Sequence, residues 1–425
     1  MQLSHYNFIK KTKDEDKYLL FNSRTGCLSL LDEEHYKAFK SFPDKDIADE
    51  DFKKQLRRCG YVVDKLEDEH DAIRYKMYRA RFKDSLLSLV IAPTINCNFA
   101  CTYCYEKTCK ETEMMTPEVY DKIIEYIEEK VDDLTKLDIT WYGGEPLMAV
   151  KIISVMNKRI KEICSKYNIE LTESMITNGY LLTEENIQFL NENDINSIQI
   201  TLDGSKEVHD TRRVLKSGKG TFDRILENLK LCSKLYTGHI DLRVNVDKQN
   251  IVKVDTLMEQ LREEGLLEVL NVYLGKVTDY NEAGSNANCL SCNAFAGENL
   301  KFIEKYSNLK RYMKKSYPYP IGNACPADYN NSLIIAPNGD LYKCHMEIGR
   351  KDSCIGNIAK RMDISVDKVK ETLFFDPIKD PVCSDCKYLP FCMGGCARAR
   401  KNGTRECDTK KYYLDQYLNA AIGDM

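Results

Sequence analysis

Apolar and polar positions alternate in two different ways along the middle of the chain. Short runs rich in Leu, Ile and Val predict buried strands, and stretches with an apolar residue every three or four positions predict amphipathic helices. The predicted strands are Leu86–Ile95, Leu137–Tyr142, Ser174–Thr177, Ser197–Leu202, Ile240–Val246 and Glu268–Val277. The predicted helices are Pro117–Val131, Val150–Tyr167, Thr183–Asn191, Thr221–Leu235 and Lys253–Glu264. This α/β alternation predicts a parallel sheet, either an open doubly wound sheet or a partial barrel, with the chemistry in the loops after the strands.

The first 83 residues predict a small module of a different kind. Two apolar runs flank the turn Ser23–Gly26 and predict a hairpin, and helical patterns and a short strand follow. These elements are Tyr18–Asn22, Cys27–Leu31, Glu33–Ser41, Glu50–Arg58, Tyr61–Val63 and the charged linking helix Glu67–Arg81. The order suits a winged-helix-like module, and it is equally compatible with an extension that merely packs on the next domain.

The last block has little periodicity after a helical stretch at Gly297–Lys315, yet it holds 10 of the 18 cysteines. A segment with many thiols and little core of its own usually depends on metal for its fold. The chain therefore divides into residues 1–83, 84–279 and 280–425.

Composition narrows the class of protein. Of 425 residues, 43% are apolar and 30% charged, with 66 acidic against 62 basic side chains and a net charge of −4. This balance argues against nucleic-acid binding through a basic face and against a polybasic membrane binder. Met1–Lys11 lacks the apolar core of a signal peptide, and the longest apolar run, Leu86–Ala92, is too short to span a membrane. We expect a cytoplasmic protein.

In a reducing compartment, so many cysteines are more typical of metal ligands than of disulfides. Only six histidines and no HExxH motif are present, so a His-based zinc hydrolase is not expected. Directly after the first strand, Cys97, Cys101 and Cys104 form a Cx3CxxC motif. Three thiolates on one short loop can hold three irons of a [4Fe–4S] cluster and leave the fourth iron open. A closed zinc site would need a fourth ligand, for which Cys109 is available.

The Cx3CxxC motif with an aromatic residue at Tyr103, followed by Gly143-Gly144-Glu145-Pro146 after the second strand, resembles the radical S-adenosylmethionine (SAM) enzymes. The resemblance implies that SAM chelates the open iron and that the segment from Gly143 to Pro146 contacts the SAM ammonium. The two glycines would let the main chain approach SAM, and Glu145 would place negative charge beside the cation. Strand-end residues match more loosely and are expected to line SAM: Thr177, Asn178, Thr201, Asp203 and Arg243, the last as partner of the SAM carboxylate.

Seven further cysteines resemble the SPASM domain of radical SAM peptide and protein maturases. The pattern is Cx13Gx4C, a gap, Cx2Cx5Cx3C, a gap and a last Cys. Two zinc knuckles are the alternative. In such relatives these residues bind two auxiliary [4Fe–4S] clusters, so three clusters are expected in all. Carried over, one auxiliary cluster has the ligands Cys383, Cys386, Cys392 and Cys407, and the other has Cys325, Cys344 and Cys396.

The second auxiliary set lacks a fourth cysteine. Fully ligated relatives have one upstream of the Cys325 position, but Tyr317–Ala324 is cysteine-free. That cluster either keeps an open iron, which we favour, or takes Cys289, Cys292 or Cys354. Two other cysteines, Cys164 and Cys232, fall within helical patterns and are expected in the core.

The resemblance implies a radical SAM maturase of a ribosomally made (RiPP) precursor peptide, of the thioether-forming sactipeptide or ranthipeptide type. In that family a winged-helix element binds the leader peptide as an added edge strand. A 5′-deoxyadenosyl radical would abstract hydrogen from the peptide, and an open iron would bind its cysteine thiolate. The other expected partner is an electron donor such as flavodoxin or ferredoxin.

Three alternatives stay open. The same machinery could form carbon–carbon cross-links, or the enzyme could mature sulfatases by oxidising Cys or Ser to formylglycine. In sulfatase-maturing relatives an acidic residue commonly follows the Cys344 position, and here it is His345. The third alternative is an iron–sulfur protein that binds peptide without turnover.

Overall fold

A computed structural model describes residues 1–12, 16–65, 67–108, 114–278, 288–307, 312, 315–360 and 364–422. It divides into two compact units. Unit 1 contains residues 1–83, 292–330 and 371–425, and unit 2 contains residues 84–291 and 331–370. Unit 2 thus includes residues 280–291 and 331–370 of the cysteine-rich block, and the rest of that block belongs to the same unit as the N-terminal segment. The three functional domains expected from the sequence stay a prediction.

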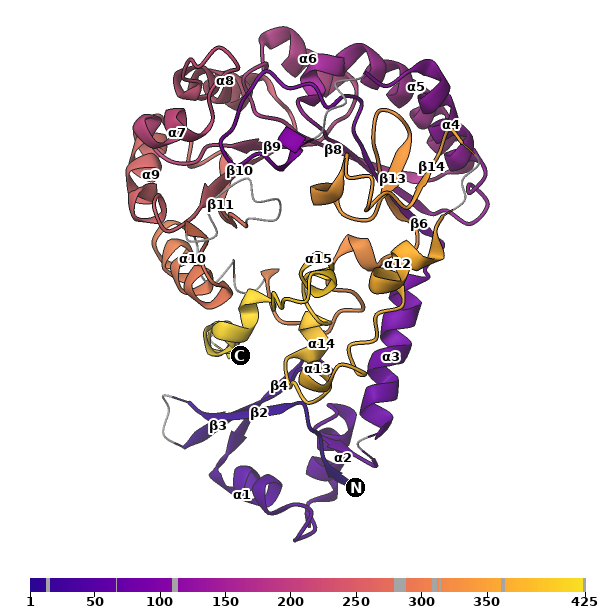
Figure 1. Ribbon diagram of the computed structural model, residues 1–425. Coiled ribbons are helices and arrows are strands. Elements are labelled where there is room, and N and C mark those ends of the chain that lie inside the picture. The colour runs from indigo at the N-terminus through magenta and orange to yellow at the C-terminus, as the bar shows by residue number, and fades with distance from the viewer. Residues whose placement is uncertain are drawn as a thin grey trace. The chain divides into compact units, whose positions relative to one another are not determined.

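Unit 2 is built on a sheet of nine strands in the order β11-β10-β9-β8-β7-β6-β12-β13-β14 (Figure 1). The strands are β6 (Leu86–Ile91), β7 (Lys136–Trp141), β8 (Glu170–Ile176), β9 (Ser197–Thr201), β10 (His239–Val246), β11 (Leu270–Lys276), β12 (Ser332–Ile335), β13 (Asp340–Tyr342) and β14 (Gly356–Asn357). Strands β6 to β11 are parallel and each lies beside the next in sequence. A doubly wound sheet would reverse its order at one point, so this order selects the partial (β/α)6 barrel.

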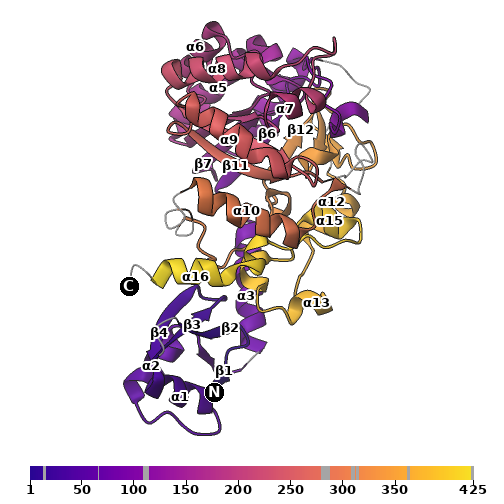
Figure 2. The same cartoon turned by 90° about the vertical axis from the view of Figure 1, so that its left-hand side faces the viewer.

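Helices connect these strands and cover the outside of the sheet (Figures 1 and 2). They are α4 (Pro117–Glu128), α5 (Val150–Tyr167), α6 (Glu184–Glu192), α7 (Lys206–Arg212), α8 (Phe222–Leu235) and α9 (Val254–Glu263). Their starts follow from the sequence, because Pro117 occupies the first turn of α4 and the Thr183 side chain caps α6. Cys164 and Cys232 are buried on α5 and α8, so their expected place in the core is confirmed. The short helix α7 was not expected.

Residues 332–357 extend the barrel sheet beyond β6. Strand β12 pairs in parallel with β6, with Ser332 opposite Ser88, and β13 and β14 follow in antiparallel pairing. The weak periodicity of this segment hid these strands, since each has only two to four residues. The extension matters for function because Cys344 and His345 follow β13 directly.

Unit 1 contains an antiparallel sheet in the order β2-β3-β4 and a separate strand pair, β1 with β5. The strands are β1 (Gln2–Leu3), β2 (Asn7–Lys11), β3 (Lys17–Asn22), β4 (Cys27–Asp32) and β5 (Val62–Val63). The hairpin of β3 and β4 is confirmed, and β2 is a strand that the polar sequence NFIKK concealed.

Helices α1 (Glu33–Ser41), α2 (Glu50–Arg58) and α3 (Glu67–Arg81) have the predicted bounds. Asp32 and Asp49 cap α1 and α2 through their carboxylates. The remaining helices of unit 1 are α10 (Cys292–Tyr306), α13 (Pro381–Ser384), α14 (Leu389–Cys392), α15 (Ala397–Lys401) and α16 (Leu414–Ile422), and α12 (Val366–Leu373) crosses the boundary between the units.

Both faces of the three-stranded sheet are covered. Leu20 and Leu31 pack with α1 and α2 on one face, and Leu19 and Phe21 pack with Phe391 and α16 on the other. The sheet is therefore left with its edges as the places where another strand could add. Within the described part of the chain, no helix is long and apolar enough to cross a membrane.

Candidate active site and cysteine sites

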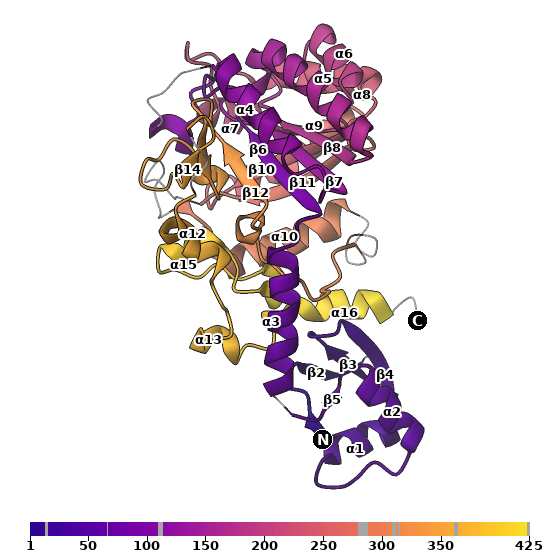
Figure 3. The same cartoon turned by 90° about the vertical axis from the view of Figure 1, so that its right-hand side faces the viewer.

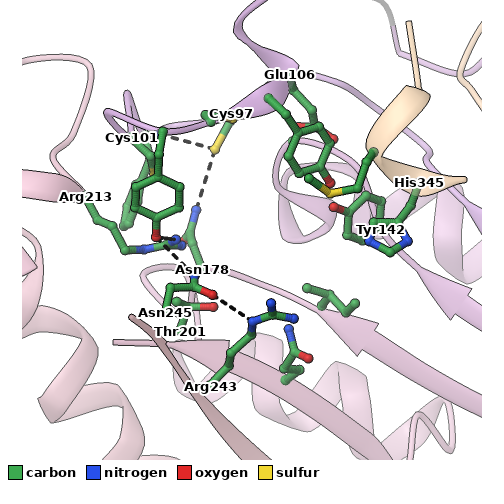
Figure 4. Close-up of a pocket in the computed structure, with 18 of the residues that line it drawn as sticks. Cys97, Cys101, Glu106, Tyr142, Asn178, Thr201, Arg213, Arg243, Asn245 and His345 are labelled. Atoms are coloured by element: carbon green, nitrogen blue, oxygen red, sulfur yellow. Dashed lines mark hydrogen bonds between the residues drawn. The ribbon is translucent and has the colours of Figure 1, made fainter. Parts of the chain in front are cut away.

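A cavity of about 240 Å³ lies in unit 2 at the carboxyl ends of the barrel strands. Parallel strands bring their following loops together at this end, which is why residues far apart in sequence meet here. The lining includes ten predicted residues: Cys97, Cys101, Tyr103, Cys104, Gly143, Gly144, Thr177, Asn178, Thr201 and Arg243. Figure 4 shows Cys97 and Cys101 at one end of this cavity and Arg243 at the other.

Backbone hydrogen bonds fix the cysteine loop in place. The amides of Ala100 and Thr102 donate to the carbonyls of Val214 and Arg212, over 2.8 and 2.9 Å. On the other side, the Asn178 side chain contacts the Cys97 sulfur at 3.8 Å and donates to Asn98 Oδ1 at 2.7 Å. The loop is therefore held by the segment after α7 and by the end of β8.

The glycine pair has a packing role in addition to the expected approach to SAM, which stays a prediction. A Cβ at Gly143 would lie 2.2 Å from the Thr94 carbonyl oxygen, and one at Gly144 would lie 2.3 Å from that of Ile95. Gly143 also has a φ of +106°, a conformation that favours glycine. The two glycines thus let this loop pack against the backbone that leads into the cysteine motif.

Glu145 is fully buried and does not line the cavity. Its carboxylate accepts hydrogen bonds from the Thr177 hydroxyl at 2.7 Å and from the amides of Asn178 and Leu147 at 2.8 and 3.0 Å. Burial raises the pKa of this carboxyl, and the three hydrogen bonds oppose that shift. Glu145 therefore ties the β7 and β8 loops together, and its contact with a SAM ammonium stays a prediction, as does any contact by the adjacent buried Pro146.

The Tyr103 hydroxyl is the centre of a polar network. It donates to Asp203 Oδ2 at 2.5 Å and accepts from Arg213 at 2.9 Å and from Asn245 at 3.1 Å. Asp203 is fully buried behind the cavity lining, where Arg212 also donates to it at 3.1 Å. Tyr103 thus joins the cysteine loop to the ends of β9 and β10.

Arg213 and Asn245 line the cavity, and the motif comparison missed both. Burial opposes the charge of Arg213, but Tyr103, Cys101 and Asp203 nearby raise its pKa well above the usual range. Asn245 accepts from Arg243 Nε at 2.8 Å, and the two residues alternate along β10. That spacing of two places side chains on the same face of a strand, and it was the signal available in the sequence.

Tyr142 and His345 form another wall of the cavity. Their rings meet edge to face with centroids 5.6 Å apart (Figure 4). Tyr142 follows β7 and His345 follows β13, so the barrel extension contributes to this wall. Because the extension was not expected, the sequence analysis did not place His345 at this cavity.

The residues present fit a thiolate-ligated cluster with a polar ligand beside it. The three thiols line one cavity, and burial raises the pKa of Cys97 to about 12 and that of Cys104 to about 11, so a bound cation would be needed to keep them ionised. Two buried polar atoms of the lining, Glu106 Oε1 and Arg213 Nε, have no hydrogen-bond partner among the described residues. The described residues contain no group of three His, Cys, Asp or Glu side chains arranged around a single metal ion, and the alternative ligand Cys109 lies outside them.

In unit 1, four predicted ligands form one group of thiols. Cys383 is influenced by the charges of Cys386 and Cys407, and Cys392 donates a hydrogen bond to Cys407. That hydrogen bond, with the positive charges of Lys411 and Arg405, lowers the pKa of Cys407. These surroundings therefore favour the anionic form at Cys407, whereas burial raises the pKa of Cys383.

Two other predicted ligands lie together in unit 1. Burial raises the pKa of Cys325, and the neighbouring charge of Cys396 raises it further. Beside Cys396, Gly395 allows the chain to pack against the segment before Cys407, since a Cβ there would lie 1.9 Å from the Glu406 carbonyl oxygen. Cys344 belongs to unit 2, so its joining this pair stays a prediction.

The candidates for a fourth ligand lie in other surroundings. The Cys354 thiol donates to the Gly356 carbonyl at 3.1 Å and packs in an apolar cluster of unit 2 with Ile334 and Tyr342. Cys292 begins α10 beside Tyr412, which also feels the charges of Cys392 and Cys407. Cys289 belongs to unit 2, at the edge of the described residues.

Residues 91–261 match the family model described as the Radical SAM superfamily. This segment spans β6 to α9 and includes the cavity's cysteine loop. These residues therefore form a radical SAM domain, the domain of enzymes that use SAM and a [4Fe–4S] cluster.

Two enzymes resemble this chain over a longer stretch than the radical SAM domain alone. The chain is 24% identical over 363 residues to the cysteine-type anaerobic sulfatase-maturating enzyme of Clostridium perfringens (strain 13 / Type A), covering 78% of this chain and 94% of the relative. It is 24% identical over 355 residues to the serine-type anaerobic sulfatase-maturating enzyme of Bacteroides thetaiotaomicron, covering 75% of this chain and 84% of the relative.

Solved structures share the fold. The structure described as native anSMEcpe with bound AdoMet aligns with a TM-score of 0.61 at 21% identity, covering 80% of this chain and 97% of that one. SuiB of Streptococcus suis aligns with a TM-score of 0.51 at 16% identity, covering 95% of this chain and 97% of that one. SuiB has also been solved bound to its precursor peptide SuiA. The fold expected from the motifs is confirmed at this level.

Proposed function

We propose that this enzyme matures a ribosomally made precursor peptide by joining a cysteine sulfur to a carbon of the same peptide. The observation that carries the proposal is that Cys325 and Cys396 lie together. In the predicted cysteine pattern, Cys344 is the one further residue assigned to the same cluster. The Cys354 thiol donates a hydrogen bond to the Gly356 carbonyl and packs in an apolar cluster of unit 2. Cys292 lies beside Tyr412, close to the thiols of Cys392 and Cys407. An auxiliary [4Fe–4S] cluster with three protein ligands keeps one iron for a substrate thiolate.

Similarity over nearly the whole chain supports a peptide substrate. The fold shared with SuiB covers 95% of this chain, and that with anSMEcpe covers 80%. SuiB binds a precursor peptide, and relatives with the sulfatase-maturating name act on a protein chain. A peptide is also a suitable substrate because an extended chain could enter the cavity at the carboxyl ends of the barrel strands.

The sheet of unit 1 supports recognition of a leader peptide. Its two faces are covered, so a peptide would add at an edge. The β2 edge is engaged, since Lys387 donates to the Asn7 carbonyl at 3.1 Å and Lys10 pairs with Asp415. Among the described residues no strand pairs with the outer edge of β4, and we place the leader there.

When bound, SAM and a cluster at Cys97, Cys101 and Cys104 would supply a 5′-deoxyadenosyl radical, whose chemistry is to take one hydrogen atom from the peptide. Formation of the sulfur–carbon bond also releases one proton and one electron, and an auxiliary cluster held by Cys325 and Cys396 would accept that electron. Tyr103, Arg213 and Asn245 would fix the position of SAM, and Arg243 would pair with its carboxylate. Tyr142 and His345 would shield the reacting carbon from water.

Anaerobic reaction of the reconstituted enzyme with SAM, dithionite and a cysteine-containing precursor peptide tests the proposal. We expect a product that has lost two hydrogens and one free thiol per cross-link. A matched peptide with Ser in place of the cysteine should release 5′-deoxyadenosine without cross-linking. Cross-linking of the serine peptide would instead establish the carbon–carbon alternative.

Sulfatase maturation is the second candidate, favoured by the names of the relatives. The presence of His345 rather than an acidic residue beside the cavity argues against it. A sulfatase-derived peptide separates the two, because formylglycine formation replaces the thiol sulfur with an aldehyde oxygen and adds no ring to the peptide.

A further inference from the structure

Glu106 lines the cavity of unit 2 but has no part in the reaction proposed above. It lies two positions after the last cysteine of the Cx3CxxC motif, in the short 3₁₀ helix Tyr105–Thr108. Among the described residues that line the cavity it is the only acidic one, whereas Arg213, Arg243 and Lys276 are basic. The cavity therefore offers a carboxylate at a single place.

The carboxylate of Glu106 has an acceptor atom that the described residues leave unused. Its Oε1 is buried and receives no hydrogen bond from any of them. Glu145, the other carboxylate of the motif loops, receives three. Burying an acceptor without a donor is costly, so such groups in proteins are usually paired. The unused oxygen thus marks a place where a ligand brings the donor.

The packing of the preceding residue fixes the position of Glu106. The Tyr105 side chain packs against an apolar cluster that includes Ile334 of β12 and Tyr342 of β13. Strand β12 pairs with β6, and the two are labelled side by side in Figure 3. The sheet therefore supports the short helix from behind. A carboxylate held on a fixed backbone is suited to selecting one geometry of its ligand.

Glu106 lies on the side of the cavity that the contacts expected for SAM leave open. Figure 4 shows it on the same side as Tyr142 and His345. Arg213 lies across the cavity, and Arg243 lies at its far end. The proposed function assigns these two arginines to SAM and the aromatic wall to the reacting carbon of the peptide. A donor that reaches Glu106 therefore comes from the peptide.

We propose that Glu106 binds the peptide substrate by accepting a hydrogen bond from an N–H group beside the carbon that reacts. This inference rests on the proposed function, because it needs a peptide in the cavity. The N–H group belongs either to the peptide backbone or to a basic side chain, and both donate in the same way. No bond to Glu106 forms or breaks. The hydrogen bond holds one carbon of the peptide in reach of the radical, so Glu106 determines where the cross-link forms.

Binding of the cysteine-containing precursor peptide to the reconstituted enzyme, with SAM present and no reductant, tests the proposal. Glu106→Ala should weaken binding about tenfold, because a hydrogen bond to a charged group is lost. Glu106→Gln keeps an oxygen acceptor without the charge. It should bind nearly as wild type does if the donor is a backbone amide, and as weakly as Glu106→Ala if the donor is a basic side chain.

The matched control is Glu128→Ala, because Glu128 is exposed at the end of α4 and does not line the cavity. It should bind the peptide as wild type does. Equal affinity of wild type and Glu106→Ala for the peptide would overturn the proposal.

The yield of cross-links separates positioning from damage to the enzyme. With dithionite, Glu106→Ala should form fewer cross-links per molecule of 5′-deoxyadenosine, while its iron content and its affinity for SAM equal those of wild type. A tenfold loss of affinity for SAM with unchanged affinity for the peptide would overturn the proposal and make SAM the partner. Loss of iron or of SAM binding in both Glu106 variants would overturn it in favour of a structural role. Failure of the proposed function would show separately, as a wild-type enzyme that binds the precursor and forms no cross-link.

Discussion

The two cysteine-bearing regions are built in opposite ways. The loop from Cys97 to Cys104 lies at the end of a sheet whose strands alternate buried and half-buried residues, and backbone hydrogen bonds hold it from both sides. The segment from Cys383 to Cys407 consists of helices of four or five residues, α13 to α15, joined by a turn in which Met393, Gly394 and Gly395 all have positive φ. The first region is held by a sheet and by backbone hydrogen bonds. The second packs on unit 1 through Leu389, Phe391 and Met393, but its thiols lie on short helices and turns that have little regular structure of their own.

This difference indicates that the two sets of thiols have different roles. In unit 2 the thiols border a cavity that a ligand can enter, so their loss should affect chemistry before stability. In unit 1 the thiols connect short helices, so their loss should affect stability first. Four predictions follow from this contrast.

Replacing Cys97, Cys101 and Cys104 together with Ala should have the largest effect. We expect 5′-deoxyadenosine formation to fall to background while the melting temperature of unit 2 stays close to that of wild type, because the backbone bonds to Arg212 and Val214 remain. Cys354→Ala is the matched control, and it should keep both iron and SAM cleavage. Unfolding of unit 2 in the triple variant would contradict the claim that these thiols act in chemistry rather than in stability.

Removing iron with a chelator should destabilise unit 1 far more than unit 2. Structural metal sites contribute on the order of 10 kcal/mol to folding, and the helices of four or five residues between Cys383 and Cys407 are too short to be stable by themselves. Limited proteolysis should cut this segment after chelation and leave β6 to β11 intact. Equal protection of both units would show that unit 1 folds without its metal.

Tyr103→Phe should have an intermediate effect confined to SAM. The change removes the hydroxyl that joins Asp203, Arg213 and Asn245, and leaving such buried polar groups unpaired costs about 1–3 kcal/mol. We expect the KM for SAM to rise about tenfold or more. Tyr236→Phe is the control, because its hydroxyl bonds to the Ile195 carbonyl away from the cavity. A similar rise in KM there would mean that Tyr103 acts through general stability.

Glu173→Gln should give the smallest effect, a change in the pH dependence of stability. Glu173 on β8 is buried, which raises the pKa of its carboxyl to about 7, against the hydrogen bond donated by Trp141 at 3.0 Å. The folded state therefore holds this proton more tightly than the unfolded chain does, and stability is lost as pH rises through about 7.

At pH 8 the variant should be more stable than wild type by about 1–3 kcal/mol in urea unfolding, and at pH 5 that gain should vanish. An identical dependence of the unfolding free energy on pH in both proteins would contradict the assignment of Glu173 as the titrating group.

Much of the fold could be predicted because local pattern and tertiary structure agree. Helix α5 has its predicted bounds, and the barrel strands coincide with the apolar runs to within a few residues. The strands that were not predicted, β1, β2 and β12 to β14, are polar or very short, and distant partners rather than their own pattern fix them as strands. The small helix α7 escaped for the same reason.

At the site, motifs located the cysteine loop and strand ends, but they did not show how the side chains act. Glu145 and the Gly143-Gly144 pair proved to have internal partners, which only the packing of the 94–96 backbone reveals. Arg213 and His345 were missed because α7 and the barrel extension bring them to the cavity. Contacts between residues that are far apart in the sequence do not appear in the local sequence pattern.

The central claim is that a radical generated beside Cys97, Cys101 and Cys104 drives cross-linking of a peptide thiol. It is tested most directly by counting cross-links and 5′-deoxyadenosine together, by mass spectrometry, in an anaerobic reaction with a cysteine-containing precursor. The account predicts one molecule of 5′-deoxyadenosine for each loss of two hydrogens and one thiol. Release of 5′-deoxyadenosine with the peptide recovered unmodified would contradict it.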